Sequence, residues 1–336
     1  MGYPRLSPGL ASGALVIALV LAGAAPAAGQ GPAAGVAAAA AANDWSVPQT
    51  PWGHPDLQGV WTTDDEISVP VERPETLGGR GELTEEETAS RTAQREAGLE
   101  RGSGQTGDGP PHWYETATQA STRASFIVDP ADGRIPYTAA GRREWDNRNL
   151  GSFKEGPFDG PEDLDLRDRC ITRGLPNTYF PSAYNNGFQI IQHADHVAIL
   201  YERLHEHRLI PLDGRPHLDA SVRQWFGDSR GRWEGDTLVV ETTNYTDRVN
   251  FRGSRDGLRL VERFTRSGPD SIHVEFTVSD PLAWSRDWTV AVNARTDANY
   301  WQIFEYACHE ANYGMFNILS GSRAQEAREA AEGGSR

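Results

Sequence analysis

The densest group of side chains that could carry out chemistry lies between positions 193 and 217. Five of the nine histidines of the chain fall in this stretch, among carboxylates and arginines. Imidazoles and carboxylates bind metal ions and transfer protons near neutral pH, and a guanidinium stabilises a developing anion. The group comprises His193, Asp195, His196, Tyr201, Glu202, His205, Glu206, His207, Arg208, Arg215 and His217.

One interpretation of this group is a metal site. If residues 203–210 form a strand, His205 and His207 point to the same face, a spacing that suits two ligands of one ion. His217, Glu202 or His309 could complete the shell, and the predicted set is His205, His207 and His217 with zinc or copper. No third ligand stands at a diagnostic spacing. The alternative, which needs no cofactor, is a solvent-facing hairpin edge.

A metal-free interpretation uses the same residues for general acid–base catalysis. His205 or His309 would exchange the proton, Glu202 or Glu310 would orient the imidazole, and Arg208 or Arg215 would stabilise the developing charge. A disulfide at Cys308 would fix the position of His309 and Glu310, and rigid elements hold a site to useful tolerance. In the alternative, His309 and Glu310 only bond nearby loops. The predicted catalytic residues are His205, His309, Glu202, Arg208 and Glu310.

Aromatic and amide side chains could line a substrate site. The chain carries 10 Trp, 10 Tyr and 11 Phe. Aromatic walls with nearby amides and arginines suit carbohydrate rings or polycyclic compounds, but they equally suit a large β core, and core is the favoured role of Trp233. The predicted substrate-binding residues are Arg215, Trp233, Asn244, Tyr306 and Asn312.

Composition excludes several classes of function. The formal net charge of −15 disfavours binding to phosphate backbones, so we expect no nucleic-acid partner. Two cysteines cannot build a zinc ribbon or an iron–sulfur cluster. The run GDSRG lacks the pattern of a serine nucleophile elbow, and no glycine-rich phosphate loop is present.

The first residues predict export. Arg5 precedes an apolar run over residues 14–25, and Ala25-Pro26-Ala27 suits signal-peptide cleavage after residue 27. No later stretch is apolar for long enough to span a bilayer. We therefore expect a periplasmic or secreted protein with no membrane insertion after cleavage. In that oxidising compartment Cys170 and Cys308 should form a disulfide.

The rest of the chain predicts one β-rich domain over residues 45–320. An Ala/Gly-rich linker covers 28–44, residues 45–186 are irregular with one short helix near 85–100, and a flexible tail covers 321–336. Thr84 and Glu87 form a capping box for that helix. From residue 187 short alternating segments predict an antiparallel barrel or sandwich. The expected strands are 55–62, 188–192, 197–202, 237–244, 258–266, 271–279, 288–295 and 300–308.

Strand alternation also assigns faces to side chains. In the 258–266 strand, Glu262 shares a row with Leu258, Leu260 and Phe264. A carboxylate on a core-facing row is either paired with an arginine or functional.

Several runs of sequence resemble a widespread family of secreted bacterial proteins. They include PWGHPDLQGVW, GDSRGRWEGDTLVVETTNY and YACHEANYG, and matching runs extend over most of residues 51–320. The resemblance implies secretion and the fold rather than a particular chemistry. The run Gly59-Val60-Trp61 is also similar to the entry strand of lipocalin-like barrels.

Three classes of function follow from these features. The first is a periplasmic hydrolase, lyase or isomerase that uses His, carboxylate and Arg chemistry on a small organic or carbohydrate substrate in a barrel cavity. The second is a lipocalin-like protein that binds a ligand without turnover, and the third is an accessory protein of the cell envelope. The clustered ionisable residues favour the enzyme, because an apolar carrier has little use for them.

Overall fold

In the computed structural model, the strands of the described residues form one antiparallel sheet. The structure describes residues 45–102, 111–154, 156–298, 300–310 and 312–333. The predicted signal peptide, residues 1–27, and linker, residues 28–44, lie outside the described residues. The described residues belong to one unit, Trp45–Arg336.

The sheet has ten strands in the described part of the chain, in the order β5-β4-β3-β1-β10-β9-β8-β7-β6, with β2 also paired to β10. The protein is therefore mainly β, as the sequence predicted. The strands are β1 (Gly59–Thr62), β2 (Ile127–Asp129), β3 (Gly187–Gln192), β4 (His196–Tyr201), β5 (His207–Pro211), β6 (Asp228–Glu234), β7 (Thr237–Thr243), β8 (Arg259–Gly268), β9 (Ser271–Ser279) and β10 (Trp288–Arg295).

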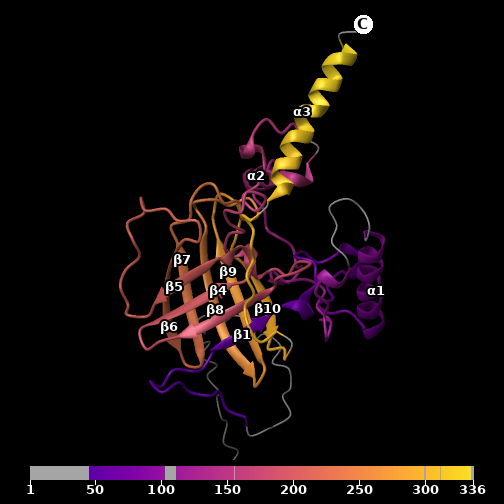
Figure 1. Cartoon of the computed structure of the whole chain (residues 1–336). Helices are drawn as coiled ribbons and strands as arrows, with labels where there is room; N and C mark the ends of the chain where they lie inside the picture. The colour runs from indigo at the N-terminus through magenta and orange to yellow at the C-terminus, as the bar shows by residue number, and fades with distance from the viewer. Residues whose placement is uncertain (1–44, 103–110, 155, 299, 311, 334–336) are drawn as a thin grey trace, which may run out of the picture. The chain divides into compact units, whose positions relative to one another are not determined.

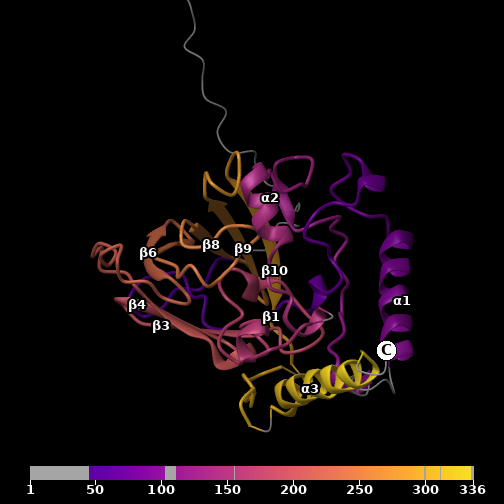
Figure 2. The same cartoon turned by 90° about the horizontal axis from the view of Figure 1, so that it is seen from above.

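The sheet curls until its two edge strands pack against each other without closing into a hydrogen-bonded barrel. Gly231 on β6 faces the side chains at the end of β5, where a Cβ atom would lie 2.7 Å from Leu212 and 2.8 Å from Ile210. Glycine is therefore the residue that lets β5 and β6 approach. Figure 1 shows the curled strands, and Figure 2 shows helices outside them.

Alternating side chains fill the inside of the curled sheet. On β9, Ile272, Val274, Phe276 and Val278 are buried while the residues between them are partly exposed. On β8, Glu262 is fully buried in the same row as Leu260 and Phe264. Hydrophobic burial of these rows stabilises the curl. The interior is a packed core that includes the charged residue Glu262 of β8.

Helix α1 (Glu85–Gly102) confirms the predicted surface helix and its capping box. The backbone N–H of Glu87 donates to the Thr84 hydroxyl at 3.2 Å, and the Glu87 carboxylate accepts from the Thr84 N–H at 2.9 Å. These two bonds satisfy amide groups that the first helical turn leaves unpaired.

Two further α-helices in the described residues were not predicted. Helix α2 (Ala139–Asp146) begins at Thr138, whose hydroxyl accepts from the Gly141 N–H. Helix α3 (Tyr313–Gly333) includes most of the segment predicted as a flexible tail. Its Ala/Glu/Arg composition favours helix, and Arg323–Glu326 and Gln325–Glu329 pair along it. No helix of the described residues combines the length and apolar character needed to cross a bilayer.

The predicted strand over 300–308 is wrong, because this segment is a loop. Its aromatic residues do not alternate between core and solvent: Trp301 is 70% exposed and Phe304 45% exposed. Its backbone amides donate to side chains of the β4–β5 connection instead of to a neighbouring strand.

Candidate functional site

Inside the curled sheet, Arg208 of β5 and Glu262 of β8 form an ion pair. Two guanidinium nitrogens of Arg208 donate to the two carboxylate oxygens of Glu262, each at 2.7 Å. The side chains are 4% and 0% exposed. Burial opposes the charge on Arg208, but Glu262 beside it holds the pKa of that guanidinium above its usual range. Glu262 thus has the arginine partner that its core-facing position suggested.

Two tyrosine hydroxyls complete this interior network. The Tyr179 hydroxyl donates to Glu262 at 2.7 Å, accepts from Arg208 at 2.8 Å and lies 2.8 Å from the Tyr201 hydroxyl. Burial raises the pKa of both tyrosines, which stay neutral donors. The predicted role of Arg208 as a clamp on substrate is therefore corrected: its side chain binds Glu262 in the core, because residues of β5 alternate between core and solvent.

A surface hollow of about 390 Å³ lies beside the disulfide between Cys170 and Cys308. The disulfide confirms the pairing predicted from the sequence. The hollow brings together two stretches of chain separated by more than a hundred residues, and the Asn312 amide donates to the Asp168 carbonyl at 2.9 Å between them. It is lined by Arg167, Asp168, Glu305, Tyr306, Ala307, Cys308 and Asn312.

Aromatic rings and an arginine stand behind this lining. The rings of Tyr184 and Tyr306 stack with centroids 6.5 Å apart and planes 15° apart. The Arg203 guanidinium lies 4.5 Å from the centre of the Tyr184 ring. Burial raises the pKa of Tyr306. The Tyr306 ring therefore gives the hollow one aromatic wall, which stacks on Tyr184.

The connection between β4 and β5 does not form the continuous strand over 203–210 that the metal interpretation required. Residues 203–205 form the short helix η7 (Arg203–His205), in which Leu204 and His205 have φ values of 62° and 52°. This left-handed turn interrupts the extended backbone, so His205 precedes β5 instead of lying on it. His205 and His207 are both exposed, but they do not belong to one strand.

Glu202 and His205 hold the segment that lines the hollow. The His205 Nε2 atom accepts from the Tyr306 N–H at 2.9 Å, and a Glu202 carboxylate oxygen accepts from the Phe304 N–H at 3.2 Å. Glu202 is 1% exposed, and burial raises its pKa. Because the Nε2 lone pair of His205 is already occupied, this histidine positions the loop in the conformation observed.

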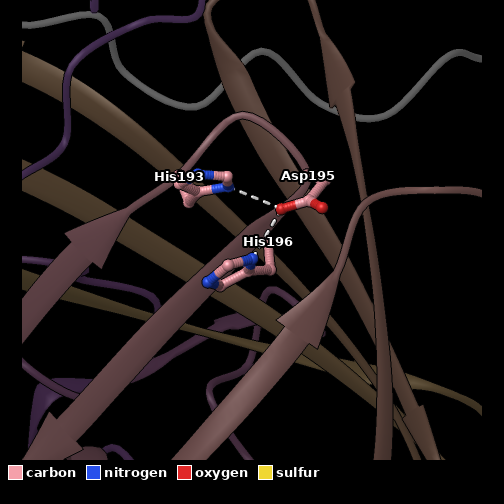
Figure 3. Close-up of side chains that lie close together, drawn as sticks. All are labelled: His193, Asp195 and His196. Carbon is pink, nitrogen blue, oxygen red and sulfur yellow. Dashed lines mark hydrogen bonds and ion pairs between the residues drawn. The ribbon is translucent and has the colours of Figure 1, made fainter.

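The predicted metal set of His205, His207 and His217 does not gather. His217 lies 2.9 Å from the Asp228 carboxylate, which also accepts from Arg230 at 2.7 Å. Among the described residues, the ligand atoms that approach one another closely enough to hold an ion belong to a different group, the His193, Asp195 and His196 side chains. Figure 3 shows these side chains at the turn between β3 and β4.

Of the remaining predicted catalytic and substrate-binding residues, some line the hollow and others lie elsewhere in the protein. Tyr306 and Asn312 line the hollow, and His309 and Glu310 are exposed just beyond Cys308. The other three, Arg215, Trp233 and Asn244, do not line it. Arg215 pairs with Asp213, Trp233 packs near His54, and the Asn244 amide donates to carbonyls of residues 218, 219 and 222.

Sequence reasoning assigned no role to Glu206 or to Arg173, in the segment that follows Cys170, and these two residues contact each other. Burial raises the pKa of Glu206 to about 7, although its carboxylate accepts from the Thr172 hydroxyl and the Arg173 N–H. Burial, together with the charges of Arg203 and Arg167, lowers the pKa of Arg173 to about 9. Glu206 belonged to the histidine-rich group, but nothing in its spacing showed that it would be buried.

The carboxyl group of Glu115 also has a raised pKa. Burial and the adjacent Asp64 carboxylate raise the pKa of Glu115 to about 8. The Asn186 side-chain amide joins the pair, donating to Asp64 at 2.9 Å and to Glu115 at 2.8 Å. Two carboxylates that share a site do not both ionise readily. No sequence signal linked these residues, which lie far apart in the chain.

Comparison with protein-family models, curated proteins and solved structures finds no match. The functional interpretation accordingly depends on the residues and geometry of the site.

Proposed function

We propose that this protein is secreted and binds a small hydroxyl-rich organic molecule, of the size of a mono- or disaccharide, in the hollow beside the disulfide. The observation that carries the proposal is the convergence of polar and aromatic side chains from residues 167–168, 305–308 and 312 on one hollow of about 390 Å³. That volume falls in the range typical of small-ligand sites.

The chemistry of the lining suits hydroxyl groups. Asp168 and Glu305 offer carboxylate oxygens as acceptors, while Arg167 and Asn312 offer nitrogen donors. The Tyr306 ring supplies an apolar face of the kind that stacks on a sugar ring. A mixture of both charges with one aromatic ring favours a polar neutral ligand over an apolar one.

Secretion is part of the proposal. The apolar run at the start of the chain has the length and flanks of a signal peptide. The disulfide that frames the hollow is compatible with an oxidising compartment. The resemblance of several sequence runs to secreted bacterial proteins supports the same location.

Acid–base catalysis is a second candidate function, favoured by Glu206, which does not line the hollow but bonds Thr172 and Arg173 in the segment that follows Cys170. A carboxyl group with a pKa of about 7 can donate or accept a proton near neutral pH. Its Oε2 atom is buried and has no hydrogen-bond partner among the described residues. His309 and Glu310 are exposed beyond the disulfide, and the sequence predicts that they exchange a proton and orient the imidazole, respectively.

A ligand screen tests the binding proposal. Ligand-observed NMR with a panel of sugars, sugar acids and small organic acids should identify ligands whose affinity falls at least about ten-fold in Tyr306→Ala and Asn312→Ala. Asn147→Ala, an exposed asparagine at the end of α2, is the matched control and should bind as the parent does. Ligands that bind all three variants equally, or a panel without any ligand, would contradict the proposal.

The same samples separate binding from turnover. Prolonged incubation of each ligand with the protein should leave its spectrum unchanged if the site only binds. If the second candidate is right, new product signals appear, and Glu206→Gln abolishes them while the affinity for the ligand stays within about two-fold, because the amide keeps the shape but not the proton exchange.

A further inference from the structure

The turn between β3 and β4 brings three potential ligand atoms together at the molecular surface. The Nδ1 atoms of His193 and His196 each lie 2.6 Å from the same Asp195 carboxylate oxygen. The two imidazole rings stack with centroids 4.7 Å apart. Figure 3 shows both rings turned toward the carboxylate. We propose that His193, Asp195 and His196 bind a divalent transition-metal ion of the zinc or copper class.

The hairpin backbone holds the three residues in register. Gln192 and Val197 are the last cross-strand pair of β3 and β4, and beyond it the His193 N–H donates to the His196 carbonyl at 2.9 Å. Residues that flank such a two-residue turn are opposite each other, so their side chains emerge on one face. The Asp195 carbonyl also accepts from the Leu212 N–H at 2.8 Å, which ties the turn to the end of β5. The site is therefore organised before any ion binds.

The donor set matches the ions proposed. Two imidazole nitrogens and one carboxylate oxygen are common ligands of zinc and copper, and a site with three protein ligands keeps a position for water. The three ligand atoms lie within 4.8 Å of one another. Tetrahedral ligands about 2.0–2.1 Å from zinc stand roughly 3.3 Å apart, so the 2.6 Å contacts need to open by less than about 1 Å.

Exposure and charge also allow an ion to enter. The side chains of His193, Asp195 and His196 are 61%, 67% and 40% exposed. Hydrogen bonds from the two histidines lower the pKa of Asp195, which keeps it an anion. Arg215 is close enough to interact with Asp195, but it is itself paired with Asp213.

This proposal is independent of the hollow. The hollow's supporting residues Glu202 and His205 follow β4, whereas the His193 group precedes it, at the other end of the β3–β4 hairpin. A six-residue strand spans about 20 Å.

Metal titration of the complete, disulfide-bonded protein tests the site. After chelator treatment and dialysis, ZnCl₂ and CuCl₂ should each bind with one-to-one stoichiometry by calorimetry near neutral pH. His193→Ala, His196→Ala and Asp195→Asn should each weaken binding by at least about ten-fold, because removal of even an outer-shell partner costs 10–100-fold. His207→Ala removes an exposed histidine outside the group and is the matched control.

A second readout reports on the same place. The Trp52 ring lies 6.1 Å from the His193 ring, so Cu²⁺ in the site should quench its fluorescence. The quenching seen in the parent should decrease in Trp52→Phe while the stoichiometry is unchanged. The proposal is overturned if no one-to-one binding is found, if the His193→Ala/His196→Ala double variant binds as the parent does, or if His207→Ala loses binding equally.

Discussion

The core of the curled sheet and the hollow beside the disulfide use the same kinds of side chain in different ways. In the core, Arg208, Glu262 and Tyr179 bond one another and are almost fully buried. At the hollow, Tyr306 and Asn312 belong to a set that remains accessible from outside. An arginine, a carboxylate and a tyrosine thus form a structural network in one place and a candidate binding site in the other.

The difference shows that access to solvent, and not residue type, separates the two roles. A buried ion pair needs hydrogen-bonded partners, because an uncompensated charge in the core is very costly. Both terminal guanidinium nitrogens of Arg208 have such partners, while its Nε atom has none among the described residues. Side chains that bind a ligand must instead keep donors and acceptors available. The stability of the core and the binding function of the hollow should therefore respond to different substitutions.

The largest effect on stability should come from the disulfide, which belongs to the hollow. Replacing both Cys170 and Cys308 by Ser releases a cross-link between residues 138 positions apart. The chain-entropy relation gives a loss of about 4–5 kcal/mol in the free energy of unfolding. Urea unfolding measures the loss, and limited proteolysis should cut the variant within residues 300–310 first. A loss below about 1 kcal/mol would show that the hollow is held by its other contacts.

Breaking the core network should have a comparable but smaller effect. Glu262→Ala leaves Arg208 buried without its partner, so the free energy of unfolding should fall by about 3–5 kcal/mol. Thermal or urea denaturation provides the measurement. Asp146→Ala, which breaks the exposed pair with Arg142, is the control and should change stability far less. Equal effects from the two variants would contradict the distinction drawn between core and surface.

A pH series tests the buried Glu206 carboxyl group near the hollow. Its pKa is raised from 4.5 to about 7 in the folded protein, so between these values the folded state binds more protons than the unfolded state. Its contribution to stability is therefore fully present below about pH 4.5 and decreases as the pH rises to about 7. Glu206→Gln should lack this decrease. When unfolding is measured from acid to neutral pH, the free energy of unfolding of the variant should therefore rise relative to that of the parent. A constant difference between the two proteins would mean that Glu206 ionises normally.

The smallest effect on stability should come from Tyr306→Phe, which removes one partly exposed hydroxyl at the hollow. We expect a decrease of no more than about 1 kcal/mol in the free energy of unfolding. Affinity for any ligand found in the screen should nevertheless fall, because Tyr306 lines the hollow and its hydroxyl is a polar group of that residue. A large loss of stability without a loss of affinity would assign Tyr306 to the core instead.

Local patterns predicted much of the fold. The strands over 271–279 and 288–295 have the predicted bounds, and the Thr84–Glu87 capping box marks the start of α1. These elements can be predicted from the sequence because strand alternation and capping involve residues that are close along the chain. The break in the strand over 203–206, on which the metal interpretation depended, was not visible, because the left-handed conformation of Leu204 and His205 has no sequence signature of the kind a glycine gives.

The candidate site was only partly predictable. Tyr306, Asn312 and the disulfide were identified from residue type and from the even cysteine count, and they do meet at the hollow. Arg208 was assigned to a site because its charge was visible in the sequence but its orientation was not. The Asp64–Glu115 pair was missed, because its two carboxyl groups come from segments with no shared pattern.

By itself the sequence determined the β-rich class, the strand faces and the disulfide partners, since these follow from local alternation and from the presence of only two cysteines. The tertiary structure decided which charged groups are buried together and which remain open to solvent. It put Arg208 against Glu262 and His193 beside His196, while it separated His205 from His217. The physical reason is that the curl of the sheet and the turns between strands set distances between side chains that spacing along the chain does not contain.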